Sequence, residues 1–150
     1  MDVRPYEFSD RVACLDVFDS LTPALLDSTA RSHFESWLDD IGGPYFVMLH
    51  EESIVGCGGY SFSADRSTAT LRWGMIRRES QKMGLGRFLL MYRIREIGRM
   101  GNAGIVLAHP PLPSAAFYEK QGFRANATVT EGDAVGFDCV EMIKKLTVCA

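Results

Sequence analysis

One short stretch decides the fold of this 150-residue chain: Gln81-Lys82-Met83-Gly84-Leu85-Gly86. It lies between a strand-like run that ends near Ile76 and a helical run that begins near Gly84. The first turn of a helix presents unpaired N–H groups and about half a positive charge, and glycines let a large anion approach the backbone. The stretch therefore predicts a strand, turn and helix whose turn binds a pyrophosphate. Basic residues flank it at Arg77, Arg78, Lys82 and Arg87.

The segments on either side of the turn predict a mixed sheet. Apolar residues at Leu85, Phe88, Leu89 and Tyr92 predict a helix that Gly101 ends, with arginines on its remaining face. The apolar run 104–108 is typical of a strand buried on both faces. A strand, helix and strand crossover of this length makes it parallel to the strand before the turn.

The rest of the chain supplies antiparallel strands and short helices. Runs 45–50, 54–62 and 68–76 predict a meander, in which Gly56, Gly58 and Gly59 predict a bulge or a close approach to the backbone. Without a repeat or a linker, residues 1–150 are expected to form a single α/β domain. The other expected elements are a strand at 3–8, a helix capped by Ser9-Asp10, a second helix that opens at Thr22-Pro23 and includes Leu25, a short helix that Ser114 caps and Gly122 ends, and a hairpin of runs 123–130 and 136–146.

Charge is distributed unevenly along the chain, whose net charge is -3. Residues 72–99 hold eight basic residues against two acidic ones, whereas residues 1–52 hold eleven acids against three arginines. This asymmetry favours an anionic ligand at the centre and a cationic partner elsewhere, although ordinary charged helix surfaces would produce it too. An acidic chain argues against nucleic acid as the partner.

Composition narrows the class of protein further. No apolar run approaches the roughly 18 residues of a membrane helix, and the first residues lack the layout of a signal peptide, so we expect a cytoplasmic protein that does not contact a membrane. The four cysteines are far apart and the three histidines have no second ligand at metal spacing, so neither disulfides nor a metal site are expected. The edge of the closing hairpin could pair two chains into a homodimer.

Two common phosphate-binding patterns fit the turn poorly. A P-loop needs a hydroxyl residue after Gly-Lys, but Arg87-Phe88 follows Gly86. A dinucleotide fingerprint needs a third small residue where Leu89 stands.

A third pattern fits the turn and a second segment together. Gln81-x-x-Gly84-x-Gly86 resembles the acyl-CoA signature of the GNAT superfamily of N-acetyltransferases, and segment 116–123, Ala-Phe-Tyr-Glu-Lys-Gln-Gly-Phe, resembles the helix-to-strand segment of that family. The order of elements also agrees over nearly the whole chain. The resemblance implies an α/β (α+β) fold: a mixed, mostly antiparallel sheet of about seven strands with about four helices, in which two parallel strands splay apart.

The resemblance also implies a co-substrate, acetyl-CoA. Its pantetheine arm would lie between the splayed strands, as an added strand does, and backbone N–H groups from Lys82 to Arg87 would hold its pyrophosphate. A backbone N–H of a bulged strand would polarise the thioester carbonyl for direct attack by an amine. The implied binding residues are Met75, Ile76, Gln81, Lys82, Met83, Gly84, Leu85, Gly86, Arg87, Ser114, Phe117 and Tyr118.

Two residues are candidates for proton transfer. Tyr118 matches the family tyrosine that protonates the departing thiolate; the alternative is an aromatic that only packs. Strand 71–76 offers no carboxylate or imidazole as a base. His109, after the second parallel strand, is therefore the first candidate, and Glu79 and Glu35 are weaker ones. A purely structural histidine is the alternative.

The sequence departs from the family pattern at two points: Pro110–Pro113 replaces a loop that often carries an asparagine touching pantetheine, and Arg78 replaces a common proline. We predict an N-acetyltransferase that transfers acetyl to a primary amine of a small molecule, peptide or protein. A non-catalytic acyl-CoA sensor is the alternative, and a nucleotide-binding module is a more distant one.

Overall fold

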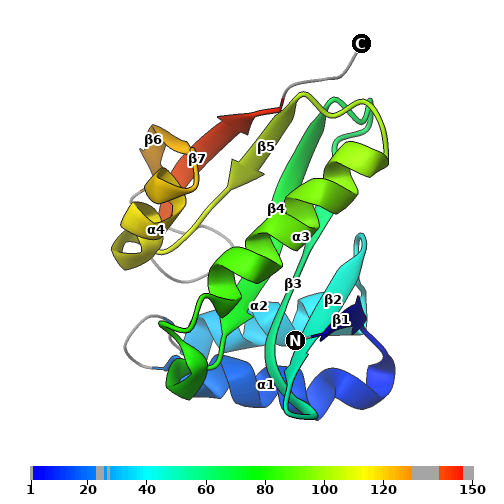
Figure 1. Ribbon diagram of the computed structural model, residues 1–150. Helices are drawn as coiled ribbons and strands as arrows, with labels where there is room; N and C mark the ends of the chain where they lie inside the picture. The colour runs from blue at the N-terminus through cyan, green and yellow to red at the C-terminus, as the bar shows by residue number, and fades with distance from the viewer. Residues whose placement is uncertain (1, 23–25, 27, 130–138, 147–150) are drawn as a thin grey trace.

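The computed structural model describes residues 2–22, 26, 28–129 and 139–146. In this part of the chain, seven strands form one sheet in the order β1-β2-β3-β4-β5-β7-β6, accompanied by four α-helices (Figure 1). The strands are β1 (Asp2–Pro5), β2 (Tyr45–His50), β3 (Ser53–Phe62), β4 (Thr68–Ile76), β5 (Ile105–Ala108), β6 (Arg124–Val129) and β7 (Cys139–Lys145). The helices are α1 (Arg11–Ser20), α2 (Ser28–Asp39), α3 (Leu85–Arg99) and α4 (Ala115–Lys120), and short 3₁₀ turns occupy η1 (Phe8–Asp10), η2 (Arg78–Ser80) and η3 (Leu112–Ser114).

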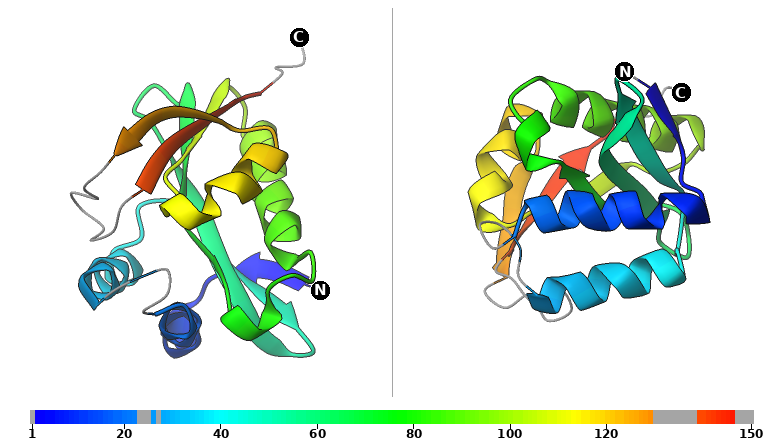
Figure 2. Two further views of the ribbon diagram at one scale, coloured as in Figure 1. Left: turned by 90° about the vertical axis from the view of Figure 1, so that its left-hand side faces the viewer. Right: turned by 90° about the horizontal axis from the view of Figure 1, so that it is seen from below.

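Helices cover both faces of the sheet. In the left view of Figure 2, α3 and α4 lie on one face and α1 and α2 on the other. Each face of the sheet has its own buried cluster. Phe18 of α1 and Phe34 of α2 pack with Tyr45 of β2 in one cluster, whereas Leu90 of α3 and Val106 of β5 belong to the other. This three-layer α/β arrangement confirms the fold class predicted from the sequence.

The strand pairing also follows the prediction. Strands β1 to β4 are antiparallel neighbours, β4 and β5 are parallel, and β7 pairs antiparallel with both β5 and β6. The closing hairpin therefore folds back so that its second strand lies next to β5 and its first strand forms the edge of the sheet.

Two expected helix caps are wrong. Asp10 and Ser114 do precede α1 and α4, but both have helical backbone angles (φ -87 and -92) and neither side chain makes a capping bond. A capping residue needs an extended backbone, and here a 3₁₀ turn runs directly into each helix. Asp10 instead accepts hydrogen bonds from Arg4 (2.8 and 2.9 Å) and from the Glu7 N–H (2.8 Å). These bonds shorten the first strand, which ends at Pro5 rather than at residue 8.

The buried face of α3 is rotated from the predicted one. Phe88 is 41% exposed, while the buried residues are Leu85, Leu89, Leu90, Arg93 and Ile97. The buried stripe thus runs at i, i+4 spacing and includes an arginine, whereas the sequence predicted every arginine on the exposed face.

Other boundaries differ in smaller ways. The Thr22 N–H donates to the Asp19 carbonyl, so Thr22 belongs to the turn that follows α1. Helix α2 begins at Ser28 instead of at Thr22-Pro23. Pro23, Leu25, the segment 130–138 and Cys149 lie outside the described residues. Cys14, Cys57 and Cys139 are buried. Among the described helices, none has the length and apolar character needed to cross a membrane.

Candidate active site

A cleft opens where β4 and β5 separate. The two strands pair at only three positions, the last joining Thr70 to Leu107, and they diverge beyond that point. A cavity of about 640 Å³ lies in the gap. Its walls come from β4, from the turn before α3, from the loop after β5 and from α4, and most of the residues predicted to act in the site line it. The predicted residues that line the cavity are Met75, Ile76, Gln81, Lys82, Gly84, Gly86, Arg87, His109, Ser114, Phe117 and Tyr118.

Two members of the predicted set lie elsewhere. The Leu85 side chain is 2% exposed and packs in the core with Met48 and Leu89, and the Met83 side chain is 52% exposed. The buried Leu85 side chain cannot contact a ligand, and the role predicted for both residues was a backbone N–H.

The turn before α3 is shaped to leave its backbone accessible. Lys82 and Gly84 have left-handed φ angles of 66° and 78°. A methyl group added to Gly84 would meet no atom within 4 Å. The turn is tied to the end of β4 because the Gln81 side-chain amide donates to the Ile76 carbonyl (3.1 Å). Since no side chain caps the helix, its first-turn N–H groups are available to an anion.

Positive charge surrounds this helix start. Lys82 and Arg87 line the cleft, and Arg78 is exposed in η2. Arg87 reaches across to α4 and donates to the Gln121 side chain (3.3 Å). Cations beside a helix N-terminus add to its field, so the site is suited to a phosphate-bearing ligand.

A β-bulge forms the deep end of the cleft. Cys57 pairs with Met75 and Gly59 with Arg72, so β4 has one residue more than β3 in this interval. The extra residue falls at Trp73-Gly74, and Trp73 has a φ of 43°. The glycines of β3 thus marked the right position, although the extra residue belongs to the neighbouring strand.

A hydrogen bond from a buried hydroxyl group, on the face of the sheet that α1 and α2 cover, fixes the bulge. The Tyr45 hydroxyl donates to the Trp73 carbonyl (2.8 Å). Burial raises the pKa of Tyr45 well above its ordinary value, so this hydroxyl keeps its proton and the bond persists at neutral pH.

Tyr118 lies in the cleft wall on α4. Its ring is half-buried between Phe117 and Phe123, at centroid distances of 5.2 and 5.5 Å and nearly perpendicular to both. The Phe123 N–H donates to the Tyr118 carbonyl (3.1 Å), which fixes the end of α4 against β6. Packing therefore orients the ring, and Tyr118 remains part of the cavity wall.

His109 follows β5 and is paired with a residue that the sequence did not single out. Its Nε2 lies 3.4 Å from a Glu141 carboxylate oxygen on β7, and the Asn126 amide donates to the other oxygen (2.6 Å). The bonds from Asn126 and then His109 hold the pKa of Glu141 below its ordinary value. Because the carboxylate stays ionised, it can accept a hydrogen bond from the imidazole and orient the ring.

The other two candidate bases lie outside the cleft. Glu35 on α2 forms ion pairs with Arg31 (3.1 Å) and Arg11 (3.8 Å), and Glu79 is exposed in η2. Neither carboxylate lines the cavity.

The proline-rich loop is anchored to the sheet. The Val140 N–H donates to the Pro110 carbonyl (3.0 Å), and Pro111 bridges Cys139 of β7. Pro110, Pro111 and Pro113 line the cleft where the family pattern often has an asparagine. In the described part of the chain, no cluster of three or more histidine, cysteine, aspartate or glutamate residues could hold a metal ion.

This combination of a splayed β4–β5 pair, a bulged β4 and an open helix start defines an acyltransferase fold, and comparison with known families agrees. Residues 13–123 match the profile of the Acetyltransferase (GNAT) family. The chain belongs to the GNAT family of acetyltransferases. No curated protein sequence matches it.

Solved structures share the fold at low sequence identity. A GNAT-family protein from Desulfovibrio desulfuricans is 20% identical with a TM-score of 0.82, covering 97% of this chain and 99% of its own. The ribosomal-protein-S18-alanine N-acetyltransferase from Escherichia coli is 19% identical with a TM-score of 0.78, covering 99% and 96%. A Salmonella typhimurium protein solved with its cofactor acetyl-CoA is 21% identical with a TM-score of 0.73, covering 100% and 96%.

Proposed function

We propose that this protein transfers the acetyl group of acetyl-CoA to a primary amine by direct attack. The observation that carries the proposal is the start of α3. Gly84 is left-handed there, no atom beyond its chain neighbours lies within 4 Å of the place where its side chain would be, and no side chain caps the helix. Unlike α1 and α4, which continue 3₁₀ turns, α3 begins at this left-handed residue beside the cleft, so its first-turn N–H groups can bind an anion.

The residues of the cleft fit acetyl-CoA along its length. The backbone N–H groups of the turn and the side chains of Lys82 and Arg87 would bind the pyrophosphate. The pantetheine arm would lie along β4 at Met75 and Ile76, where β4 has no partner strand on the β5 side. Its thioester would then lie beside the bulge at Trp73-Gly74.

Two side chains would move the protons of the reaction. His109, oriented by Glu141, would accept a proton from the attacking ammonium. The nitrogen lone pair then forms the new C–N bond while the carbonyl π electrons move to oxygen. When the C=O bond re-forms, the C–S bond breaks and sulfur takes its electron pair. Tyr118 would give that sulfur a proton. The new amide nitrogen would lose its second proton to solvent, and solvent would return one to Tyr118.

A non-catalytic acyl-CoA sensor is the second candidate. It is favoured by one observation: none of the described residues that line the cleft is an aspartate or a glutamate. The paired His109 and Glu141 argue for catalysis, because a sensor has no need of an oriented base.

Release of free CoA thiol separates the two candidates. The protein is incubated with acetyl-CoA and a panel of polyamines, aminoglycosides and peptides, and thiol is measured with a chromogenic disulfide. We expect thiol release that depends on both protein and amine. A protein that binds acetyl-CoA but releases no thiol with any acceptor is a sensor, and one that does not bind acetyl-CoA contradicts both candidates.

A further inference from the structure

Arg93 is a buried cation without a counter-ion in the described structure. Its side chain lies on α3 and is 3% exposed, and the other buried charged residue of the described chain, Asp10, is paired with Arg4. None of the described carboxylates lies within ion-pair distance of Arg93. A buried guanidinium without an anion is costly, so Arg93 is suited to a ligand that brings an acceptor oxygen or developing negative charge.

Two glycines make room for the guanidinium. A methyl group on Gly74 would lie 2.6 Å from Arg93 Nη2, and one on Gly58 would lie 3.2 Å from Nε. Arg93 Nη1 donates to the Gly59 carbonyl at 3.3 Å. Nε is buried without an acceptor, and Nη2 has no acceptor among the described residues. The guanidinium thus lies against the bulge with donors to spare.

The Arg93 side chain belongs to the wall of the cleft. Arg93 lines the cavity together with Trp73, Gly74 and Met75. Along β4, the bulge comes directly before Met75 and Ile76, which would contact the pantetheine arm. The proposed function therefore brings the thioester of acetyl-CoA next to Arg93.

We propose that Arg93 is a catalytic residue whose guanidinium donates a hydrogen bond to the thioester carbonyl oxygen. This inference rests on the proposed function. When the amine attacks and the carbonyl π electrons move to oxygen, the guanidinium faces the developing negative charge. A fixed, buried cation stabilises such charge strongly, so Arg93 would add to the backbone N–H of the bulged strand.

Recognition of an acidic group on the acceptor is less consistent with the position of Arg93. Helix α3 lies on the face of the sheet opposite α1 and α2 (Figure 2). Leu21 and Leu26, which line the other end of the cleft, come from the chain between α1 and α2. An acceptor entering on that side would reach the thioester before it reached Arg93.

Infrared spectroscopy tests the contact without an acceptor. Acetyl-CoA labelled with ¹³C at the carbonyl is bound to the wild type, to Arg93→Met and to the control Arg95→Met, an exposed position on the same helix. We expect the bound carbonyl band of the wild type and of Arg95→Met to lie at lower wavenumber than that of free acetyl-CoA. Most of this shift should be lost in Arg93→Met, while affinity for CoA, which has no carbonyl at this position, stays the same.

A measurement on the wild type covers the case in which Arg93→Met does not fold. The ¹⁵N and ¹H resonances of the Arg93 guanidinium are followed by NMR while CoA or acetyl-CoA is added. They should move with acetyl-CoA beyond any change caused by CoA. Equal changes with both ligands would overturn the proposal.

Kinetics complete the test once an acceptor is known. Arg93→Met should lower kcat about 100- to 1,000-fold, as the loss of an oxyanion donor does, with little change in KM for the acceptor. An unchanged carbonyl band with a raised acceptor KM would instead assign the guanidinium to an acidic group of the acceptor. If the wild type shows no bound carbonyl band because it does not bind acetyl-CoA, the proposed function itself fails.

Discussion

Replacing Gly84 with alanine should separate ligand binding from folding. In the free protein the new methyl group meets nothing within 4 Å, so the cost comes only from its left-handed φ of 78°. That conformation costs an alanine about 1–2 kcal/mol, which corresponds to a fall in Tm of about 2–8 °C for a chain of this size. The fold should therefore survive.

Binding should suffer more than stability. The methyl group would project from the backbone where the diphosphate is expected to approach the first-turn N–H groups. Loss of one charge-assisted hydrogen bond costs about 1.5–3 kcal/mol, so CoA should bind about 10- to 100-fold more weakly. Titration calorimetry with CoA measures the affinity, and a thermal melt of the same sample measures the stability.

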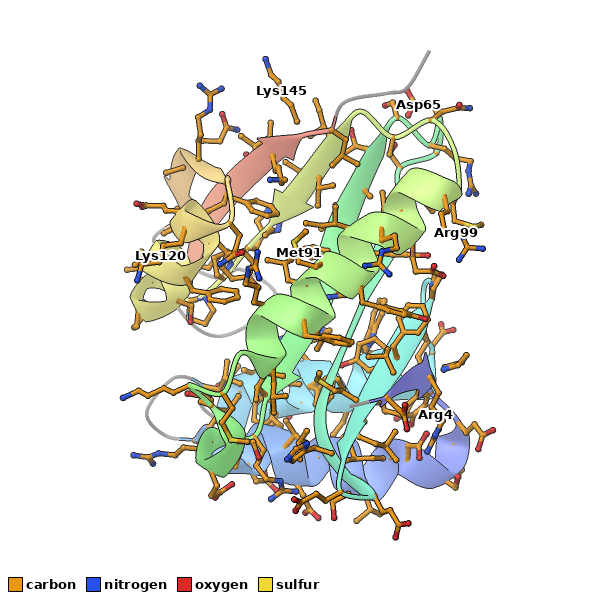
Figure 3. The ribbon with its side chains drawn as sticks, in the orientation of Figure 1. Arg4, Asp65, Met91, Arg99, Lys120 and Lys145 are labelled. Atoms are coloured by element: carbon orange, nitrogen blue, oxygen red, sulfur yellow. The ribbon has the colours of Figure 1, made fainter. Side chains whose placement is uncertain are left out.

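Gly101→Ala is the matched control. Gly101 follows the other end of α3, has a φ of 127° and also has no neighbour within 4 Å of an added methyl group. It lies about 25 Å along the helix axis from Gly84. Figure 3 labels Arg99 at this end of α3, far from the turn that begins the helix. Its variant should lose stability yet bind CoA as the wild type does. Equal CoA affinity in both variants would refute the reasoning.

Three further substitutions test other parts of the structure. Tyr118→Phe should lower turnover about 100-fold or more and leave CoA affinity nearly unchanged; unaltered turnover would remove the tyrosine from the acid role. Glu52→Gly should raise the free energy of unfolding by about 0.5–1 kcal/mol. Glu51 and Glu52 form the two-residue loop between β2 and β3 with φ of 52° and 68°, and such angles favour glycine. Urea melts measure the effect, and a loss of stability would contradict the prediction. Asp10→Asn should cost about 2 kcal/mol at neutral pH, since it removes the negative charge and one of the two oxygens that accept from Arg4, which lies at the β1 edge in Figure 3. The bond from Arg4 lowers the pKa of Asp10 from 3.8. The stabilisation is therefore present above that pH and is lost as the pH falls through the lower pKa of the folded protein. In melts at successive pH values, the difference in stability between Asp10→Asn and the wild type should shrink in acid, and a constant difference would contradict the assignment.

The parts of the site that depend on local sequence could be predicted. The turn, the start of α3 and the parallel β5 follow from glycine spacing, apolar periodicity and the length of the crossover, all of which act within a short segment. Gly58 and Gly59 likewise marked the position of the bulge.

The parts that depend on distant contacts could not be predicted. Glu141 meets His109 from 32 residues away in the sequence, and no local pattern pairs β5 with β7. The bulged residue is Trp73, whose left-handed backbone no propensity would assign to a tryptophan. The sequence does contain one indication that Arg93 is buried, because Arg93 continues the i, i+4 series of Leu85, Leu89 and Ile97. A buried series through Phe88 and Tyr92 fits the sequence equally well.

The most direct test of the central claim compares CoA with pantetheine, which lacks the phosphates and the adenosine of CoA, at several salt concentrations, because only the contribution of the phosphates is screened by salt. The claim is that the open start of α3 binds a diphosphate, so calorimetry should show pantetheine binding at least 100-fold more weakly than CoA, with the difference shrinking as salt screens the charges. Equal affinity for the two ligands would contradict the claim.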